Sequence, residues 1–169
     1  MEIGKLLMGD AYHMSSTDKD MNDLGKMNGM TLPMFPFNTD GIDIHATNVL
    51  IERLNITNYD DAVAVKPCTK NYKLCSCTEN VLVKDCNMWA SVGMSIGSVT
   101  PSDEYACVRN VTFINHRFHH PAKAVYIKTN PGTTETMAPG SGGEITGITY
   151  ENIYSKGAVW WPIYIGPQQ

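Results

Sequence analysis

Five short segments with the same alternating pattern recur along the chain and limit its fold more than any other feature. Each segment carries two apolar residues separated by one residue, at positions 42/44, 63/65, 94/96, 125/127 and 163/165. The offsets between successive copies are 21, 31, 31 and 38 residues. Alternation without a helical period is typical of short β-strands. A recurring unit of this length predicts a coil of stacked strands.

A second set of strand-like segments accompanies four of these copies. They begin at Asn48, Asn80, Asn110 and Gly147, and each is again short and rich in β-branched residues. Because two columns of strands recur together, we predict an all-β fold, a parallel β-helix of about five rungs stacked about 4.8 Å apart. A β-sandwich with coincidental spacing is the alternative.

The domain organisation follows from where this pattern starts. Residues 1–37 show no sustained period and contain Pro33 and Pro36, so we expect an irregular N-terminal segment there. The β-helix occupies residues 38–169. Since the chain stops directly after a strand without a cap, we expect a fragment of a longer protein, truncated at its C-terminus. Two insertions, residues 67–79 and 129–144, either form the walls of a groove beside one sheet or serve only as connections.

Charge and hydropathy exclude several classes of function. The net charge of −4 and the pI near 5.7 give no basic surface for general nucleic-acid binding. The sequence contains no apolar run of about 18 residues that would span a membrane. The first residues lack the apolar region of a signal peptide.

The five cysteines favour disulfides, with one cysteine left over, over a metal site. The sequence has no CxxC motif and no pair of histidines at matching spacing, so we expect no metal. A bond from Cys68 to Cys75 or Cys77 would close the first insertion. The sequons at Asn55 and Asn110 permit glycosylation if the chain is secreted.

Three carboxylates precede the first two copies of the repeat. Asp40 and Asp61 occupy the same position on neighbouring rungs, and Asp60 is adjacent. Strict alternation would bury Asp40 and Asp61 in the core, which is costly for unpaired carboxylates, so we expect a bend that turns them into a groove. Crowding should raise at least one of their pKa values. A protonated acid beside an ionised base is what glycoside hydrolysis needs, whereas the alternative is a pair of Asx turns.

These carboxylates lie in a longer motif that resembles a known family. The segments Asn38-Thr39-Asp40-Gly41-Ile42-Asp43, Asp60-Asp61, Gly97-Ser98 and Ile127-Lys128 resemble glycoside hydrolase family 28, the polygalacturonases and their relatives, over about residues 38–155. The resemblance implies a right-handed parallel β-helix of the pectin-lyase-like type that hydrolyses pectin with inversion. By this resemblance Asp60 matches the general acid, and Asp40 and Asp61 match the carboxylates that activate water. Lys128, Tyr126 and Asn38 are the residues expected to bind substrate.

The chain also departs from the family pattern. Val92 stands where the family has a histidine, and Ala62 where it usually has a cysteine. Tyr126 stands where the family has an arginine. It lacks the guanidinium that binds a carboxylate through two hydrogen bonds, although its ring could stack on a sugar. Three explanations fit: a different substrate specificity within the family, a weakened or inactive homologue, or a histidine supplied elsewhere, for which His45 is a candidate.

Two further groups of residues allow both a functional and a structural interpretation. A local basic segment either lines the groove or forms a solvated turn, and it comprises His116, Arg117, His119, His120 and Lys123. An aromatic group near the last strand either stacks on sugars or belongs to a ladder or core, and it comprises Trp160, Trp161 and Tyr164.

We therefore expect an O-glycosyl hydrolase of the polygalacturonase type that cleaves galacturonan or rhamnogalacturonan without metal or cofactor. Its partner would be a pectic polysaccharide, with no nucleic acid and no membrane, and the protein would be monomeric and, by the resemblance, extracellular. The alternative is a catalytically weakened or inactive β-helix that binds cell-wall polysaccharide. A lyase of the same fold is the third and weaker choice, because such enzymes usually use calcium with a basic residue, and the sequence sets no such residue beside the three aspartates. A separation of about 6.5–9.5 Å between Asp60 and Asp40 would fit an inverting site.

Overall fold

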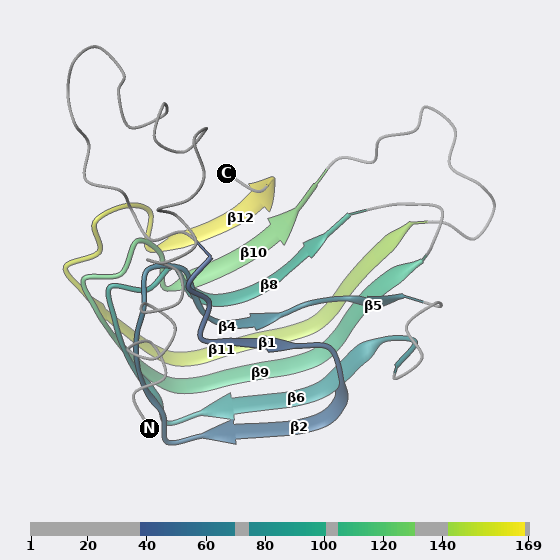
Figure 1. Ribbon diagram of the computed structural model, residues 1–169, viewed down its shortest axis with the longest axis horizontal. Helices are drawn as coiled ribbons and strands as arrows, with labels where there is room; N and C mark the ends of the chain where they lie inside the picture. Colours follow the sequence, from purple (N-terminus) through teal and green to yellow (C-terminus); the bar gives the residue numbers. More distant parts are fainter. Residues whose placement is uncertain (1–37, 70–74, 101–104, 131–141, 168–169) are drawn as a thin grey trace, which may run out of the picture.

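The computed structural model describes residues 38–69, 75–100, 105–130 and 142–167 of the chain. In these ranges every regular element is a β-strand, and the strands run parallel in every pair except one (Figure 1). The same ranges contain no helix that is long and apolar enough to cross a membrane. The irregular segment expected at residues 1–37 lies outside the described residues.

The first sheet contains five parallel strands in the order β1-β4-β8-β10-β12. These strands are β1 (Ile42–Ile44), β4 (Asp61–Val65), β8 (Gly93–Val99), β10 (Val125–Thr129) and β12 (Ile163–Pro167). The register aligns Ile42, Val63, Met94, Val125 and Ile163 across the sheet. The predicted register of the first column is therefore confirmed.

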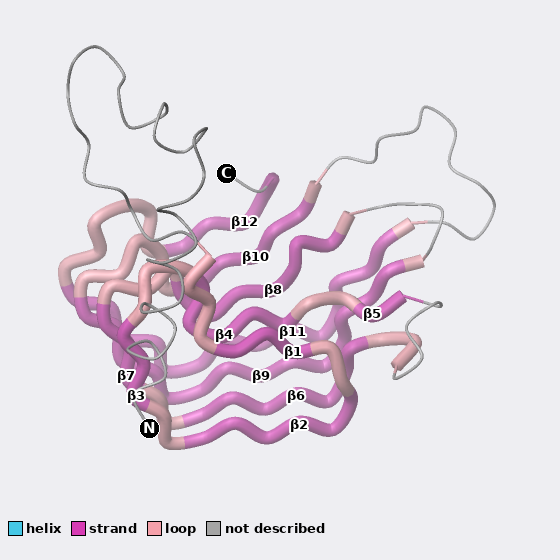
Figure 2. The backbone as a smooth tube through the Cα atoms, viewed as in Figure 1, coloured by secondary structure: helices cyan, strands magenta, loops and turns pink. Residues whose placement is uncertain are grey.

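The second sheet carries the other column of strands. It consists of β2 (Thr47–Glu52), β3 (Asn55–Thr57), β5 (Cys68–Thr69), β6 (Thr78–Lys84), β7 (Asn87–Trp89), β9 (Ala106–His119) and β11 (Gly143–Lys156). Val49, Val81, Val111 and Ile148 are aligned across β2, β6, β9 and β11, as the sequence predicted. The long strand β9 pairs with β6 in its first part and with β7 at its end, so the chain turns through three strand segments per coil (Figure 2). The prediction of an all-β parallel β-helix is confirmed.

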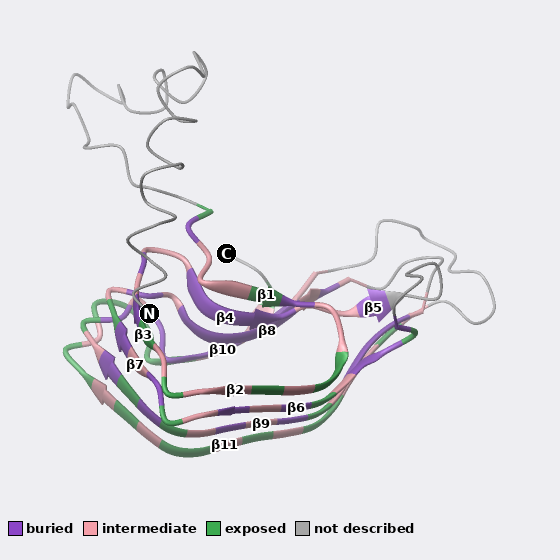
Figure 3. Ribbon diagram, turned by 60° about the horizontal axis from the view of Figure 1, so that its bottom comes forward, coloured by how far each residue is buried: buried purple, intermediate pink, exposed green. Residues whose placement is uncertain are grey.

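The core lies between the two layers of strands (Figure 3). Val63, Val65 and Ile96 from the first sheet are completely buried, and so are Val83 and Phe113 from the second. Each such side chain stabilises the fold by about 1.5–3 kcal/mol relative to an exposed one. The alternation of the sequence thus turns one face of each sheet into this core and the opposite face outward.

Asparagines at the corners of the coil hold each turn in a left-handed conformation. Asn48, Asn80 and Asn110 follow one another on successive rungs with positive φ, and Asn tolerates this region better than most residues. The amide of Asn80 donates to Asn48 at 3.0 Å, and the amide of Asn110 donates to Asn80 at 2.8 Å. The sequence pattern placed these residues at strand starts but did not reveal this hydrogen-bonded ladder.

Replacing Asn80 by alanine in the full-length protein should lower the free energy of unfolding by about 1–2 kcal/mol. The alanine must adopt a positive φ and cannot bridge the two neighbouring asparagines. Asn80→Gly is the matched control, since glycine loses the amide but accepts the backbone conformation. Urea unfolding should find the glycine variant the more stable of the two. Equal losses would show that backbone strain contributes nothing.

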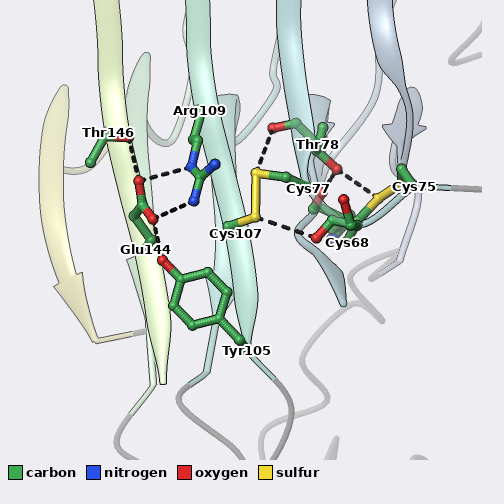
Figure 4. The surroundings of a disulfide bond; sticks show 11 residues. Cys68, Cys75, Cys77, Thr78, Tyr105, Cys107, Arg109, Glu144 and Thr146 are labelled. Carbon is green, nitrogen blue, oxygen red and sulfur yellow. Dashed lines mark hydrogen bonds and ion pairs between the residues drawn. A yellow bond between two sulfur atoms is a disulfide. The ribbon is translucent and has the colours of Figure 1, made fainter. Parts of the chain in front are cut away.

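Two disulfides attach the first insertion to the second sheet. Cys68 bonds Cys75, and Cys77 bonds Cys107 on β9 (Figure 4). Cys86 is a buried free thiol. The structure therefore selects Cys75 as the partner of Cys68. It also pairs Cys107, which stands isolated in the sequence. The leftover cysteine expected from the sequence is Cys86.

An ion pair beside these disulfides joins β9 to β11 (Figure 4). The Arg109 guanidinium donates to both carboxylate oxygens of Glu144, at 2.9 and 2.7 Å, and the hydroxyls of Tyr105 and Thr146 donate to the same carboxylate. Hydrogen bonds from Arg109, Tyr105 and Thr146 lower the pKa of Glu144 to about 2. The start of β11 is thereby fixed against its neighbour.

The expectation of a solvated turn at the basic segment is wrong for His116 and its neighbours in β9. His116 and Phe118 alternate into the interior and are completely buried, whereas Arg117 between them is exposed. The two ring nitrogens of His116 contact the Cys86 amide and the Val83 carbonyl, at 3.3 and 3.1 Å. Burial lowers the pKa of His116 to about 4, so this histidine is a neutral core residue at physiological pH.

Candidate active site

The three carboxylates singled out by the sequence meet at the start of the first sheet. Asp40 precedes β1, Asp60 precedes β4, and Asp61 is the first residue of β4. Each offers a carboxylate oxygen, and these three oxygens all lie within 4.8 Å of one another. The Gly41 amide donates to the Asp61 carbonyl at 2.8 Å, which sets the two aspartate-bearing segments side by side.

Asp61 turns away from the core through an irregularity in the sheet, but it stays completely buried and is not exposed in a groove as expected. The pairing of β4 with β8 shifts register between Asp61 and Val63. The Ser95 hydroxyl donates to Asp61 Oδ1 at 2.5 Å, and Ser95 alternates with the core residues Met94 and Ile96 on β8. Asp61 therefore lies on the outer face of the sheet, although its side chain is completely buried.

Lys128 compensates the buried charge of Asp61. Its ammonium forms an ion pair with Asp61 Oδ2, and its own side chain is only 6% exposed. Burial raises the pKa of Asp61, while the charge and hydrogen bond of Lys128 and the hydrogen bond of Ser95 oppose this effect. In this structure Lys128 neutralises Asp61, and its expected contact with substrate stays a prediction.

Asp60 is oriented by backbone amides. The Asn38 amide donates to Asp60 Oδ2 at 3.0 Å, and the Asp61 amide donates to Oδ1 at 2.8 Å. Asn38 thus contacts the cluster through its backbone, and a substrate contact of its exposed side chain stays a prediction. The Val92 amide donates to the Asp60 carbonyl at 2.8 Å, so the residue that replaces the family histidine adjoins Asp60 on the next rung.

Asn58 connects the two segments that carry the carboxylates. Its buried side-chain amide contacts the carbonyls of Thr39, Asp60 and Asp61 at 3.0, 2.8 and 2.8 Å. Neither Asn58 nor Ser95 was among the predicted site residues. Ser95 is a polar residue between two apolar core residues of β8, so the alternation of the strand could have shown that its side chain faces outward, toward Asp61.

The surroundings of Asp40 favour its protonated form. Burial, followed by the charges of Asp60, Asp61 and Asp43, raises the pKa of Asp40 to about 7, and only the Lys66 ammonium, 3.7 Å from Asp40 Oδ2, opposes this shift. The expected rise in at least one pKa is confirmed.

The upper bound on the separation of the carboxylates overlaps the lower end of the range set for an inverting site. The closest oxygens lie within 4.8 Å, and the carboxyl carbons are at most about 2.5 Å further apart. This reaches only the lower part of the range of about 6.5–9.5 Å that leaves room for a water molecule. Clustered oxygens of this kind could also hold a hard cation, although the Lys128 ammonium already neutralises one of the three charges.

Tyr126 does not present an open ring to a sugar. It is only 3% exposed, and the ammonium groups of Lys123 and Lys128 lie 4.2 and 5.1 Å from its ring centroid. The ring of Tyr164 packs against it edge-on at 5.7 Å. The expectation that Tyr126 stacks on a sugar is therefore not supported, because two lysines and an aromatic ring already surround it.

His45 lies one residue beyond the end of β1, whereas Asp40 precedes the start of that strand. Its role as a replacement for the missing histidine stays a prediction. Trp160 and Trp161 stack on each other at 4.8 Å and remain 49% and 46% exposed, so they project outward from the segment before β12.

A parallel β-helix with a cluster of three aspartates on the outer face of one sheet is the architecture of a polysaccharide-cleaving glycoside hydrolase. The chain belongs to glycosyl hydrolases family 28, whose model matches residues 10–168. This match is longer than the 38–155 over which the motifs resemble the family.

Curated relatives agree with this assignment. The chain is 32% identical to "Probable endopolygalacturonase D" of Neosartorya fischeri over 121 residues, which are 71% of the chain and 22% of the relative. It is 40% identical to "Probable endo-xylogalacturonan hydrolase A" of Aspergillus fumigatus over 99 residues, 57% of the chain and 21% of the relative. It is 28% identical to "Endopolygalacturonase I" of Aspergillus oryzae over 151 residues, 89% of the chain and 34% of the relative. The chain thus spans between 21% and 34% of the length of these relatives. A search of solved structures found no match.

Proposed function

We propose that this chain carries the catalytic carboxylates of a polygalacturonase-type glycoside hydrolase that cleaves glycosidic bonds in pectic polysaccharide. The observation that carries the proposal is the cluster of Asp40, Asp60 and Asp61, with oxygens within 4.8 Å and one pKa raised to about 7. Such a cluster provides a proton for the leaving oxygen and an ionised carboxylate to activate water.

The finer steps rest on the family resemblance. Asp60 would donate the proton to the leaving oxygen, while Asp40 and Asp61 would activate the attacking water with inversion. Asp60 must be protonated before it can donate, and a carboxylate oxygen of Asp40, whose pKa is raised to about 7, lies within 4.8 Å of one of its own. Lys66 and Lys128 bring positive charge to the cluster and suit an acidic polysaccharide. Galacturonan, rhamnogalacturonan and xylogalacturonan are the candidate substrates. The two disulfides fit an extracellular location.

The second candidate function is a non-catalytic β-helix that binds cell-wall polysaccharide. It is favoured by Val92, which adjoins Asp60 with a side chain that can neither titrate nor donate, and by the absence of an arginine at Tyr126. In this case the carboxylates would be remnants and the outer face of the sheet would serve binding alone.

Reducing-sugar release by the full-length protein distinguishes these two functions. We expect release from polygalacturonate, xylogalacturonan or rhamnogalacturonan, and we expect Asp60→Asn to reduce it to the background. Activity equal to that of the Asp60→Asn control on every substrate would reject the hydrolase and favour the binding protein. NMR of the first product formed then reports the anomer, and retention of configuration would reject the inverting mechanism.

A further inference from the structure

A pocket apart from the three aspartates lies at the corner where β9 leaves β6 and joins β7 (Figure 2). Its volume is about 620 Å³, which falls in the range of about 300–1,000 Å³ that is usual for ligand sites. None of the clustered carboxylates lines it. We call it the corner pocket and define it by two columns of side chains from three successive rungs: Asp85, Asn115 and Asn152, and Asn87, Arg117 and Tyr154.

The first column forms a fixed wall of the corner pocket. Asp85, Asn115 and Asn152 all have positive φ, so the backbone bends in the same way on each rung. The Asn115 amide donates to Asp85 Oδ1 at 3.0 Å, and the Asn152 amide donates to Asn115 Oδ1 at 3.1 Å. These hydrogen bonds hold the three polar side chains in one row.

The second column forms the opposite wall, two residues further along the strands. Asn87, Arg117 and Tyr154 are aligned in register on β7, β9 and β11. Arg117 and Tyr154 are exposed, and the Arg117 guanidinium makes no ion pair with any residue that the structure describes. His116 and Ile153 lie between the walls with their side chains directed to the core, so their backbone forms the floor.

The groups that line the corner pocket suit the hydroxyls of a neutral sugar. The carboxylate of Asp85 and the guanidinium of Arg117 balance each other in charge, and the asparagine amides can donate as well as accept. A uronic acid would bring a second carboxylate close to Asp85, and a purely apolar ligand would leave the polar walls without partners. The ring of Tyr154, which is 52% exposed, adds an apolar face for a sugar ring.

An aromatic pair continues this surface along the strands. Trp89 and His119 are aligned in register, two residues or about 6.6 Å beyond Asn87 and Arg117. Their rings stack at 5.0 Å, and Trp89 is 39% exposed. Trp89 therefore offers apolar surface to a sugar unit that is linked to the one in the pocket.

We propose that the corner pocket binds one unit of a neutral oligosaccharide, with the ring of Tyr154 against the sugar and with Asp85 and Arg117 bonded to its hydroxyls. The next unit of the ligand packs on Trp89. This inference goes beyond the proposed function, because it adds a binding site that takes no part in hydrolysis.

Calorimetry on the full-length Asp60→Asn protein tests this site with cellotetraose, xylotetraose and galactotetraose, and with tetragalacturonate as the acidic ligand. At least one neutral tetrasaccharide should bind with a Kd of about 1 mM or tighter. Adding Tyr154→Ala should weaken that binding about tenfold, whereas Tyr154→Phe keeps the ring and should weaken it less than about threefold. Arg117→Gln should weaken it about fivefold. Arg53→Gln is the matched control and should not change it, because Arg53 is an exposed arginine that does not line the pocket.

Three results would overturn the proposal: no binding of any neutral tetrasaccharide, neutral binding that Tyr154→Ala and Arg117→Gln leave unchanged, or binding of tetragalacturonate that both variants weaken as strongly. The Tm should stay close to that of the parent protein, because both side chains are exposed. In the protein with Asp60 intact, the same two variants should keep kcat/KM on polygalacturonate within about twofold. A protein that hydrolyses no substrate but binds a neutral tetrasaccharide in this way would overturn the hydrolase and leave the corner pocket standing.

Discussion

Replacing Lys128 by methionine is expected to lower the free energy of unfolding by about 3–5 kcal/mol at neutral pH, because it leaves the buried Asp61 carboxylate without its cation. Asp61 is completely buried, and Lys128 is its ion-pair partner. Methionine fills much of the same volume, so the loss reports the charge and not a cavity. The hydroxyl of Ser95 remains as a donor to Asp61 but carries no compensating charge.

The size of this effect should depend on pH. Without Lys128 the fold accepts Asp61 mainly in its protonated form, so the folded-state pKa of Asp61 rises still further above the unfolded value of about 3.9. A group with a raised folded pKa stabilises the fold below its unfolded pKa and loses that contribution as pH rises. The difference between wild type and variant should therefore be small near about pH 4 and grow by up to about 1.4 kcal/mol per pH unit towards neutrality.

Urea unfolding of the full-length protein at several pH values checks this prediction. Adding Asp61→Asn to Lys128→Met should recover part of the stability at neutral pH, since no buried charge is left unpaired. Lys84→Met is the control for loss of an exposed ion pair, and its unfolding midpoint should stay close to that of wild type at every pH. A Lys128→Met protein as stable as wild type at neutral pH would show that the buried pair does not support this site.

The sequence predicts those parts of the fold where each residue clearly prefers either the core or the solvent. The pairs 42/44, 63/65 and 94/96 put apolar side chains on one face, and stacking them in register places Asp40 beside Asp61 without further information. The register was therefore predictable, and the meeting of the carboxylates followed from it.

Other features depend on long-range contacts that local pattern does not contain. The Cys77–Cys107 bond crosses 30 residues, and only the pairing of β6 with β9, which sets Thr78 opposite Val108, brings these cysteines together. His116 belongs to a polar run, yet the alternation with Phe118 buries its ring between two backbone groups. Lys123 looks like a surface lysine in the sequence, yet it is buried and the rings of Tyr126 and Trp160 lie against its ammonium. In each case a neighbouring rung provides the contact partner of a side chain whose local sequence does not predict that contact.

Replacing Asp40 by asparagine is expected to lower kcat/KM by about 10²–10⁴-fold while it stabilises the fold at neutral pH. The substitution removes a carboxylate assigned to water activation and also the proton that the cluster holds. It relieves the burial and the repulsion from Asp60, Asp61 and Asp43 that raise the pKa of Asp40 to about 7. Because that pKa is raised, the stabilising contribution of Asp40 is present below about pH 4 and lost as pH approaches about 7. The stability gained in Asp40→Asn should therefore appear over this interval, reaching about 1–3 kcal/mol at its upper end, since the side chain is only one quarter exposed.

Asp43→Asn provides the matched control for this trade of activity against stability. Asp43 makes the same 3.7 Å contact with the Lys66 ammonium, but its side chain is 45% exposed and it is not one of the three clustered carboxylates. Asp43→Asn should keep kcat/KM within about threefold of wild type and gain less stability than Asp40→Asn, because its side chain is more exposed. Kinetics and urea unfolding of both variants over the interval from about pH 4 to about pH 8 decide the matter. If Asp40→Asn keeps full activity, or gains the same stability at both ends of the interval, the proton of this site does not reside on Asp40, and the water-activating role must pass to Asp61 alone.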